Sequence, residues 1–328
     1  MTSNTTETES LAGWLPYSIR WEWSPPSILW RHFGSERLVE PFFDQAIDRR
    51  HHDPNHREQD RITSLEALDG LPTVRPPAGF IFHTSRCGST LVAQVLASVP
   101  EHTVISEATI LSSIIRPPAQ TPEMSRGQRA QLLRSVVNAL AQSRTEREAL
   151  CFIKFGAADV RHFELLQCAF PHVPWIFLYR DPLEVMSALL RVRSDSLPPG
   201  LIESRILDED AESVKAMRPS EFWARVLRSH MEAALQAQEA GSVRLVNYSQ
   251  LPEAIWSSLP GFFGTSCSAR AIEAMKAASR FNAKAPSRLF VDDRESKRST
   301  ATDEMRVHVD RLLMPLYERL EAIRLSEA

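Results

Sequence analysis

The segment at residues 80–96 combines an apolar run, a polar turn and a helical pattern, FIFHTSRCGSTLVAQVL. The turn consists of Ser85, Arg86, Cys87, Gly88, Ser89 and Thr90. Such a turn directs several backbone N–H groups at one point, and a helix N-terminus adds partial positive charge. Gly88 lets the backbone approach a ligand closely, and Arg86 can make bidentate contacts to phosphate or sulfate oxygens. We therefore expect this turn to bind a doubly charged anion.

The turn differs from the phosphate loop of ordinary ATPases and GTPases. That motif is G-x-x-x-x-G-K-[ST], whereas Gly88 is followed directly by Ser89, so the lysine that reaches the outer phosphates is missing. A kinase-like phosphotransferase remains an alternative that needs Mg²⁺ and acidic ligands near the loop. Asp159 and Asp181 are available, but both are explained as helix caps. A strand-turn-helix that binds no ligand is a further alternative.

Strands and helices alternate from residue 79 onward, and they must position this turn. Apolar runs typical of buried strands occupy 79–83, 103–106, 150–155, 174–179 and 242–248. Helical patterns occupy 89–99, 124–147, 159–170, 219–240 and 301–325. Strands that alternate with helices imply a parallel sheet covered on both faces. We predict an α/β fold with a central parallel sheet and helices on both faces.

The predicted main domain spans residues 71–328, and residues 1–70 form an extension that packs on it. Residues 11–45 hold four of the seven tryptophans, namely Trp14, Trp21, Trp23 and Trp30. We expect these aromatics to dock the extension, with a wall of an acceptor pocket as the alternative. The three histidines at 51, 52 and 56 are interpreted as an exposed turn, because no carboxylate or cysteine stands at ligand spacing with a buried flank. No metal site is predicted.

Composition narrows the class of protein. The chain has 328 residues, 43% of them hydrophobic, and a formal net charge of -3, without the basic excess typical of nucleic-acid binders. The sequence contains no run of about 18 apolar residues, so no membrane span is predicted. The N-terminus MTSNTTETES does not resemble a secretory signal. The four cysteines form no C-x-x-C pair. We expect a cytoplasmic enzyme without nucleic-acid or membrane partners.

Two motifs together resemble those of sulfotransferases that use 3′-phosphoadenosine 5′-phosphosulfate as donor. The turn after Thr84 is similar to the loop that holds the 5′-phosphosulfate in this family, and WIFLYRDPLEVMSALLR at 175–191 is similar to the segment that binds the 3′-phosphate. The resemblance implies that Arg180 binds the 3′-phosphate. The family serine lies eight residues after this arginine, where this chain has Ala188. Ser187, one residue earlier, is therefore the candidate.

The resemblance also implies which residues carry the reaction. LCFIKF at 150–155 matches the strand whose lysine, here Lys154, stabilises the transferring group together with Arg86; the alternative is a lysine that snorkels from a strand end. The histidine base of many members is replaced by Gly156. Other members use a glutamate after the second strand, which predicts Glu107 as the base. Its alternative is a carboxylate that only complements a helix dipole.

Weaker candidates complete the predicted site. His83 and His102 are alternative bases, each interpreted first as a structural or surface histidine. For Arg180 the alternative is an ion pair with Asp181 or Glu184 at the helix start. The segment 290–301 resembles the basic loop that closes over the nucleotide, and its candidates are Lys297 and Arg298. Residues 194–218 are a candidate part of the acceptor pocket or a lid.

The predicted function is transfer of a sulfuryl group from 3′-phosphoadenosine 5′-phosphosulfate to a hydroxyl or amine. The acceptor class is a small molecule or peptide, and no metal is expected. The alternatives are the kinase-like phosphotransferase and a non-catalytic nucleotide-binding module.

Overall fold

The structure, a computed structural model, describes residues 10–54, 59–74, 76–118, 121–193, 207, 210–241, 243–291 and 299–327. Five strands form the central sheet in the order β5-β6-β4-β7-β8, and all neighbouring pairs are parallel. Their bounds are β4 (Gly79–His83), β5 (His102–Ser106), β6 (Leu150–Lys154), β7 (Trp175–Tyr179) and β8 (Val243–Asn247). This sheet confirms the predicted fold class, and each strand lies within one residue of its predicted bounds.

Alternate side chains along the strands pack in two separate hydrophobic cores. On β4, Phe80 and Phe82 pack in one core and Ile81 packs in the other. On β7, Phe177 belongs to the first core and Ile176 to the second. Because successive side chains of a strand point to opposite faces, the sheet is buried on both sides.

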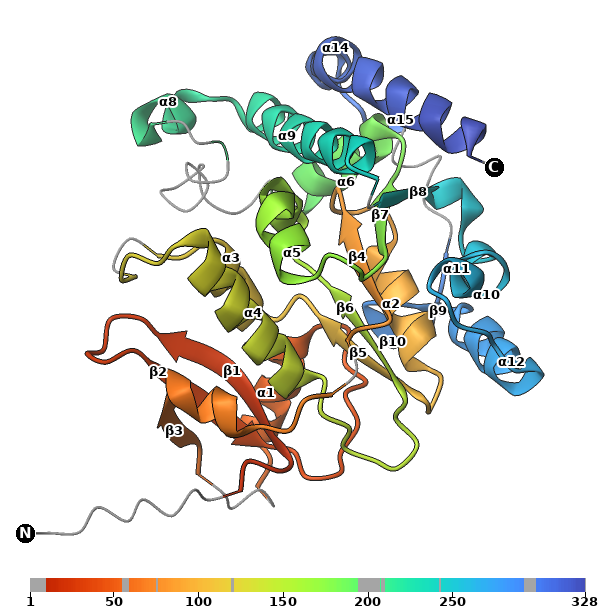
Figure 1. Ribbon diagram of the computed structural model, residues 1–328. Helices are drawn as coiled ribbons and strands as arrows, with labels where there is room; N and C mark the ends of the chain where they lie inside the picture. Colours follow the sequence, from red (N-terminus) through yellow and green to blue (C-terminus); the bar gives the residue numbers. More distant parts are fainter. Residues whose placement is uncertain are drawn as a thin grey trace, which may run out of the picture.

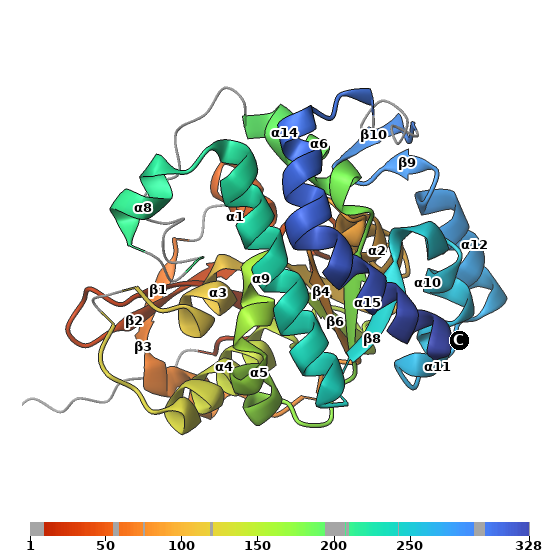
Figure 2. The same ribbon diagram turned by 90° about the horizontal axis from the view of Figure 1, so that it is seen from above.

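Helices cover both faces of the sheet (Figures 1 and 2). One face carries α2 (Ser89–Ala97), α10 (Ala254–Ser257), α11 (Leu259–Phe262) and α12 (Ala269–Ala278). The other face carries α3 (Thr109–Ile115), α4 (Arg126–Leu140), α5 (Phe163–Ala169), α6 (Pro182–Arg193), α9 (Pro219–Glu239), α14 (Asp303–His308) and α15 (Met314–Ser326). Shorter elements are η1 (Leu65–Gly70), η2 (Ala157–His162), α8 (Ala211–Ala216) and η3 (Tyr248–Gln250).

The extension before the main sheet forms a sheet of its own. Its three antiparallel strands have the order β1-β2-β3, and their bounds are β1 (Trp14–Arg20), β2 (Ser27–His32) and β3 (Arg61–Ser64). The helix α1 (Phe43–His51) lies between β2 and β3 in the sequence. Trp30 is fully buried and Trp14 nearly so, in the same core as Phe80 of β4. β1 packs on α3 and α4. Trp14, Trp21 and Trp30 thus pack in the core that also holds Phe80, whereas Trp23 is exposed.

Several helices depart from their predicted bounds. α4 begins after Ser125, whose side chain forms a capping box with Gln128, and it is shorter than the predicted 124–147. The predicted helix 159–170 is divided into η2 and α5. The predicted 301–325 is divided into α14, a π-helical turn (Val309–Leu313) and α15. None of the helices in the described residues is long and apolar enough to cross a membrane.

A hairpin that the sequence pattern did not predict precedes the C-terminal helices. It consists of β9 (Phe281–Asn282) and β10 (Ala285–Leu289), paired antiparallel. Lys297 and Arg298, predicted to close over the nucleotide, lie outside the described residues. Most of the candidate lid, at 194–206 and 208–209, also lies outside them.

Candidate functional site

A cavity of about 710 Å³ opens at the carboxyl edge of the central sheet. The segment after each of the five strands contributes to its wall: the loop after β4, Glu107, Gly156, Arg180 and Tyr248. In open parallel sheets, ligands bind at this edge, next to the strand where the strand order reverses. β4 is that strand, because β5 and β6 lie on one side of it and β7 and β8 on the other.

The loop after β4 has a backbone conformation that side chains rarely adopt. The φ angles are 80° at Ser85, 51° at Arg86 and 90° at Gly88. At a residue other than glycine this conformation costs roughly 1–2 kcal/mol, and such strain clusters at functional sites. The imidazole of His83 supports the turn, because its Nδ1 accepts a hydrogen bond of 3.0 Å from the Ser85 N–H. α2 begins at Ser89, so its first turn adds N–H groups to the same loop.

The predicted loop residues divide into two groups. Those that line the cavity are Ser85, Arg86, Gly88, Ser89 and Thr90. Cys87 points away from the cavity: its thiol is buried and donates a hydrogen bond of 3.2 Å to the carbonyl of Leu178 on β7. The Cys87 side chain thus anchors the loop to the sheet.

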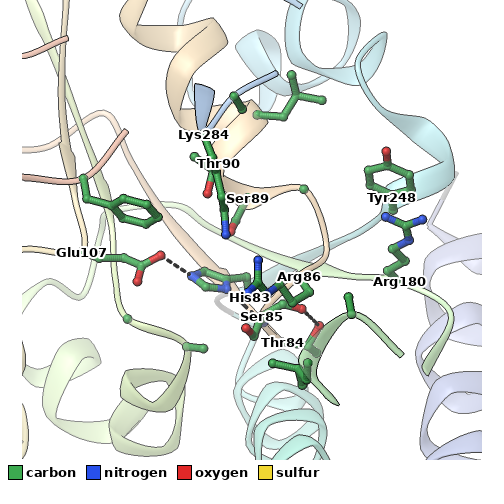
Figure 3. Close-up of a pocket in the computed structure, with 18 of the residues that line it drawn as sticks. His83, Thr84, Ser85, Arg86, Ser89, Thr90, Glu107, Arg180, Tyr248 and Lys284 are labelled. Atoms are coloured by element: carbon green, nitrogen blue, oxygen red, sulfur yellow. Dashed lines mark hydrogen bonds and ion pairs between the residues drawn. The ribbon is translucent and has the colours of Figure 1, made fainter. Parts of the chain in front are cut away.

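Lys154 and Glu107 form an ion pair behind the loop. Lys154 is fully buried, so it does not snorkel to the surface. Its Nζ lies 5.1 Å from the ring centre of Phe42, and both Phe42 and Glu107 line the cavity in front of it. Glu107 has a φ of 51°, and its carboxylate also lies 3.4 Å from Nε2 of His83 (Figure 3).

The charges in this cluster shift one another's pKa. Burial alone would raise the pKa of Glu107, but His83 and Lys154 outweigh burial and hold that pKa well below its usual range. Burial lowers the pKa of Lys154, and the negative charge of Glu107 opposes this effect. A base is most effective when its pKa lies near the working pH. Glu107 is therefore a weak base as long as it is paired with Lys154.

Arg180 lies at the other end of the cavity and is almost completely buried. Its Nε donates a hydrogen bond of 2.6 Å to Glu184, so the ion pair expected as the alternative is present. The guanidinium also stacks on Tyr248, 4.0 Å from the ring centre. The Tyr248 ring in turn packs on Gly88, where a Cβ would lie 2.8 Å from the ring. Tyr248 thus connects the loop to Arg180 (Figure 3).

Two predicted site residues, Ser187 and His102, lie outside the cavity. Ser187 is buried and its hydroxyl contacts the sulfur of Met305 at 3.5 Å, while Ala188 lines the cavity. His102 lies at the start of β5, where its Nδ1 is 3.0 Å from the carbonyl of Leu96. In the described part of the chain, the structure therefore does not bring Ser187 or His102 to the cavity.

The cavity also contains residues that the sequence did not single out. The main ones are Phe42, Arg116, Trp223, His230 and Lys284. Arg116 donates from Nε to Asp159 at 2.9 Å, and the fully buried Asp159 also accepts a hydrogen bond of 3.0 Å from the N–H of Gly156 at the start of η2. Of these residues, those on α9 have a recognisable helical spacing. Lys284 on the hairpin follows no motif.

Lys284 predicts a pH dependence of anion binding. Burial, followed by the charges of Arg86 and Lys154, lowers its pKa to about 8. In Figure 3 its side chain extends from the hairpin toward the middle of the cavity. The ammonium is present below pH 8 and is lost above it. Affinity for adenosine 3′,5′-bisphosphate should therefore fall between pH 8 and pH 9 by up to about tenfold.

Isothermal titration calorimetry at several pH values measures this effect. In the Lys284→Met variant, the affinity should not fall between pH 8 and pH 9. The proton uptake that accompanies binding to wild type at pH 8.5 should also disappear. Lys276→Met, which removes an exposed lysine of α12, is the matched control. An equally steep fall in the Lys284→Met variant would contradict the assignment.

The chain matches no protein family and no curated protein by sequence. Six of the solved structures that are similar to it are sulfotransferases. One from Alicyclobacillus acidocaldarius is 15% identical with a TM-score of 0.46, over 76% of this chain and 96% of that chain. One from Mycobacterium avium is 10% identical with a TM-score of 0.44, over 74% and 78% of the two chains. A mouse sulfotransferase complexed with PAP is 12% identical with a TM-score of 0.42, over 83% and 99%.

Proposed function

We propose that this chain transfers a sulfuryl group from 3′-phosphoadenosine 5′-phosphosulfate to a hydroxyl or amine of a small-molecule or peptide acceptor. One observation carries the proposal: Arg86 and Arg180, at the ends of two different strands, line the same cavity. The donor has two anionic groups, the 5′-phosphosulfate and the 3′-phosphate. Arginine suits both, because its planar fork of donors matches phosphate and sulfate oxygens.

The loop is the proposed site of the 5′-phosphosulfate. Arg86, the hydroxyls of Ser89 and Thr90, and the N–H groups of the first turn of α2 supply donors that are in place before the ligand binds. Sulfuryl transfer is an in-line displacement in which negative charge develops on the leaving oxygen. Preorganised donors that stabilise such charge contribute strongly to the rate.

Lys154 and Glu107 are the proposed catalytic pair. When the donor binds, Lys154 exchanges Glu107 for the oxygens of the leaving phosphate and stabilises their charge. Glu107 then loses its counter-ion, and its pKa rises toward the range in which it can accept the proton of the acceptor hydroxyl. The ion pair thus compensates both charges until the donor arrives.

Ligand-induced stabilisation tests the proposal. Adenosine 3′,5′-bisphosphate without Mg²⁺ should raise the melting temperature, since saturation at 100 times Kd adds about 2.7 kcal/mol. Radiolabelled sulfate from the donor should then appear in a screened acceptor. Stabilisation by ATP only with Mg²⁺ would indicate a phosphotransferase instead. Bisphosphate binding with no transfer to any acceptor class would indicate a nucleotide-binding module.

The Arg180→Ala variant should weaken binding of adenosine 3′,5′-bisphosphate by about 10- to 100-fold, because a hydrogen bond to a charged group contributes about 1.5–3 kcal/mol. Binding of adenosine 5′-monophosphate should change little. The variant leaves Glu184 buried without its cation, so an Arg180→Ala/Glu184→Gln variant controls for folding. Calorimetric titration with both nucleotides measures the difference. An equal loss for the two nucleotides would contradict the role of Arg180.

A further inference from the structure

A stripe of α9 forms one wall of the cavity, and one of its residues is polar and buried. The stripe consists of Trp223, Val226, Leu227 and His230. Their spacing of three, four and seven residues places them on one face of the helix. His230 is only 3% exposed. It is therefore a histidine in a wall that is otherwise aromatic and aliphatic.

Both ring nitrogens of His230 are buried without a hydrogen-bond partner among the described residues. The backbone of Thr84 is near enough to favour the protonated ring, but no hydrogen bond of acceptable distance and angle forms with it. Buried polar atoms are nearly always hydrogen-bonded in proteins, and an unsatisfied one is destabilising. His230 thus lines the cavity and has a donor and an acceptor that no described residue satisfies.

The surroundings assign His230 to the end of the cavity near Glu107. The charges that act on it most strongly belong to His83, Arg161 and Arg116. His83 is the residue that contacts Glu107. Burial, followed by these charges, lowers the pKa of His230 to about 3. The ring is therefore neutral at physiological pH and presents one N–H and one lone pair.

We infer that His230 is an acceptor-binding residue: its ring hydrogen-bonds an O–H or N–H group of an acceptor whose apolar part packs on the rest of the α9 stripe. The inference rests on the proposed function, because it identifies the free space near Glu107 as the acceptor side. It narrows the acceptor class to a molecule with an apolar body and a hydrogen-bond donor. A fully polar acceptor would leave Val226 and Leu227 in contact with polar groups.

Paired probes that differ only in one donor group test this inference. 4-Methylphenol has an O–H group that stays protonated at neutral pH, and 4-methylanisole is the same molecule with that group methylated. Both are titrated into protein saturated with adenosine 3′,5′-bisphosphate. Wild type should bind the phenol about tenfold more tightly than the anisole, as expected for one hydrogen bond in a desolvated site.

Variants of two histidines then assign that preference. His230→Phe, which keeps the ring shape without nitrogen, should bring the ratio close to one, and His230→Gln, which keeps a donor and an acceptor, should restore part of it. His102→Phe is the matched control, because His102 is buried away from the cavity. It should leave the ratio unchanged. An unchanged ratio in His230→Phe, or no binding of either probe to wild type, would overturn the inference.

Melting temperatures separate a role in binding from a role in folding. His230→Phe should melt at the same or a higher temperature, because it removes two unsatisfied atoms. His102→Phe should melt about 2–4 °C lower, because it removes a hydrogen-bonded ring. Equal destabilisation by both variants would mean that His230 serves the fold and would overturn the inference. Failure of wild type to bind the bisphosphate would refute the proposed function, whereas this comparison tests His230 without any ligand.

Discussion

The Lys154→Met variant should lose about 100- to 1000-fold in the rate of sulfuryl transfer, the usual effect of removing one group that stabilises developing charge. Its affinity for adenosine 3′,5′-bisphosphate should fall by a much smaller factor, because Arg86, the loop hydroxyls and Arg180 still bind the two phosphates. Single-turnover transfer with radiolabelled donor measures the rate, and calorimetry measures the affinity. A loss in rate that is much larger than the loss in affinity distinguishes a catalytic lysine from one that only attracts anions.

Stability provides the control for this variant. Lys154→Met leaves the Glu107 carboxylate without its cation, which should lower the free energy of unfolding by about 1–3 kcal/mol. The double variant Lys154→Met/Glu107→Gln removes both charges and should recover most of that loss without recovering transfer. If the single variant folds and still transfers within tenfold of the wild-type rate, Lys154 does not have the proposed role.

The Gly88→Ala variant should lose about 100-fold or more in affinity for adenosine 3′,5′-bisphosphate. Alanine is strained at a φ of 90°, and its Cβ would lie 2.8 Å from the ring of Tyr248. Tyr248 must then move, and the guanidinium of Arg180 that stacks on it loses its support. The substitution should also lower the free energy of unfolding by about 1–3 kcal/mol.

Gly127→Ala is the matched control for this substitution. Gly127 lies in the first turn of α4, and the nearest atom to its Cβ position is the hydroxyl oxygen of Ser125 at 3.9 Å. Alanine there should be neutral or slightly stabilising and should leave binding unchanged. Denaturant unfolding and calorimetry compare the two variants. Wild-type affinity in Gly88→Ala would exclude close contact between the loop backbone and the ligand.

Local patterns explain why much of the fold and site could be predicted. The five core strands are short apolar runs buried on both faces, a signal that survives without tertiary information. Glu107, Lys154 and Arg180 each stand at or just after the end of a strand. Because parallel strands end at one edge of the sheet, their sequence positions already implied a common cleft.

Other features depend on packing that a sequence pattern does not contain. The rotation of α6 is set by contacts such as that of Ser187 with Met305, and it directs Ala188 to the cavity instead. Lys284 reaches the site from a hairpin with no motif of its own. His230 follows a helical spacing typical of any buried helix face. Only the assembled cavity distinguishes these two residues from ordinary ones.

The left-handed conformation of Ser85, Arg86 and Glu107 sets the activity of this site against the stability of the fold. Glycine at any of the three positions would relax the backbone, yet it would delete a hydroxyl, a cation or a carboxylate from the cavity wall. Selection for thermal stability alone would therefore replace these three side chains first. Laboratory evolution that selects only for soluble, heat-tolerant protein should yield a more stable protein without activity.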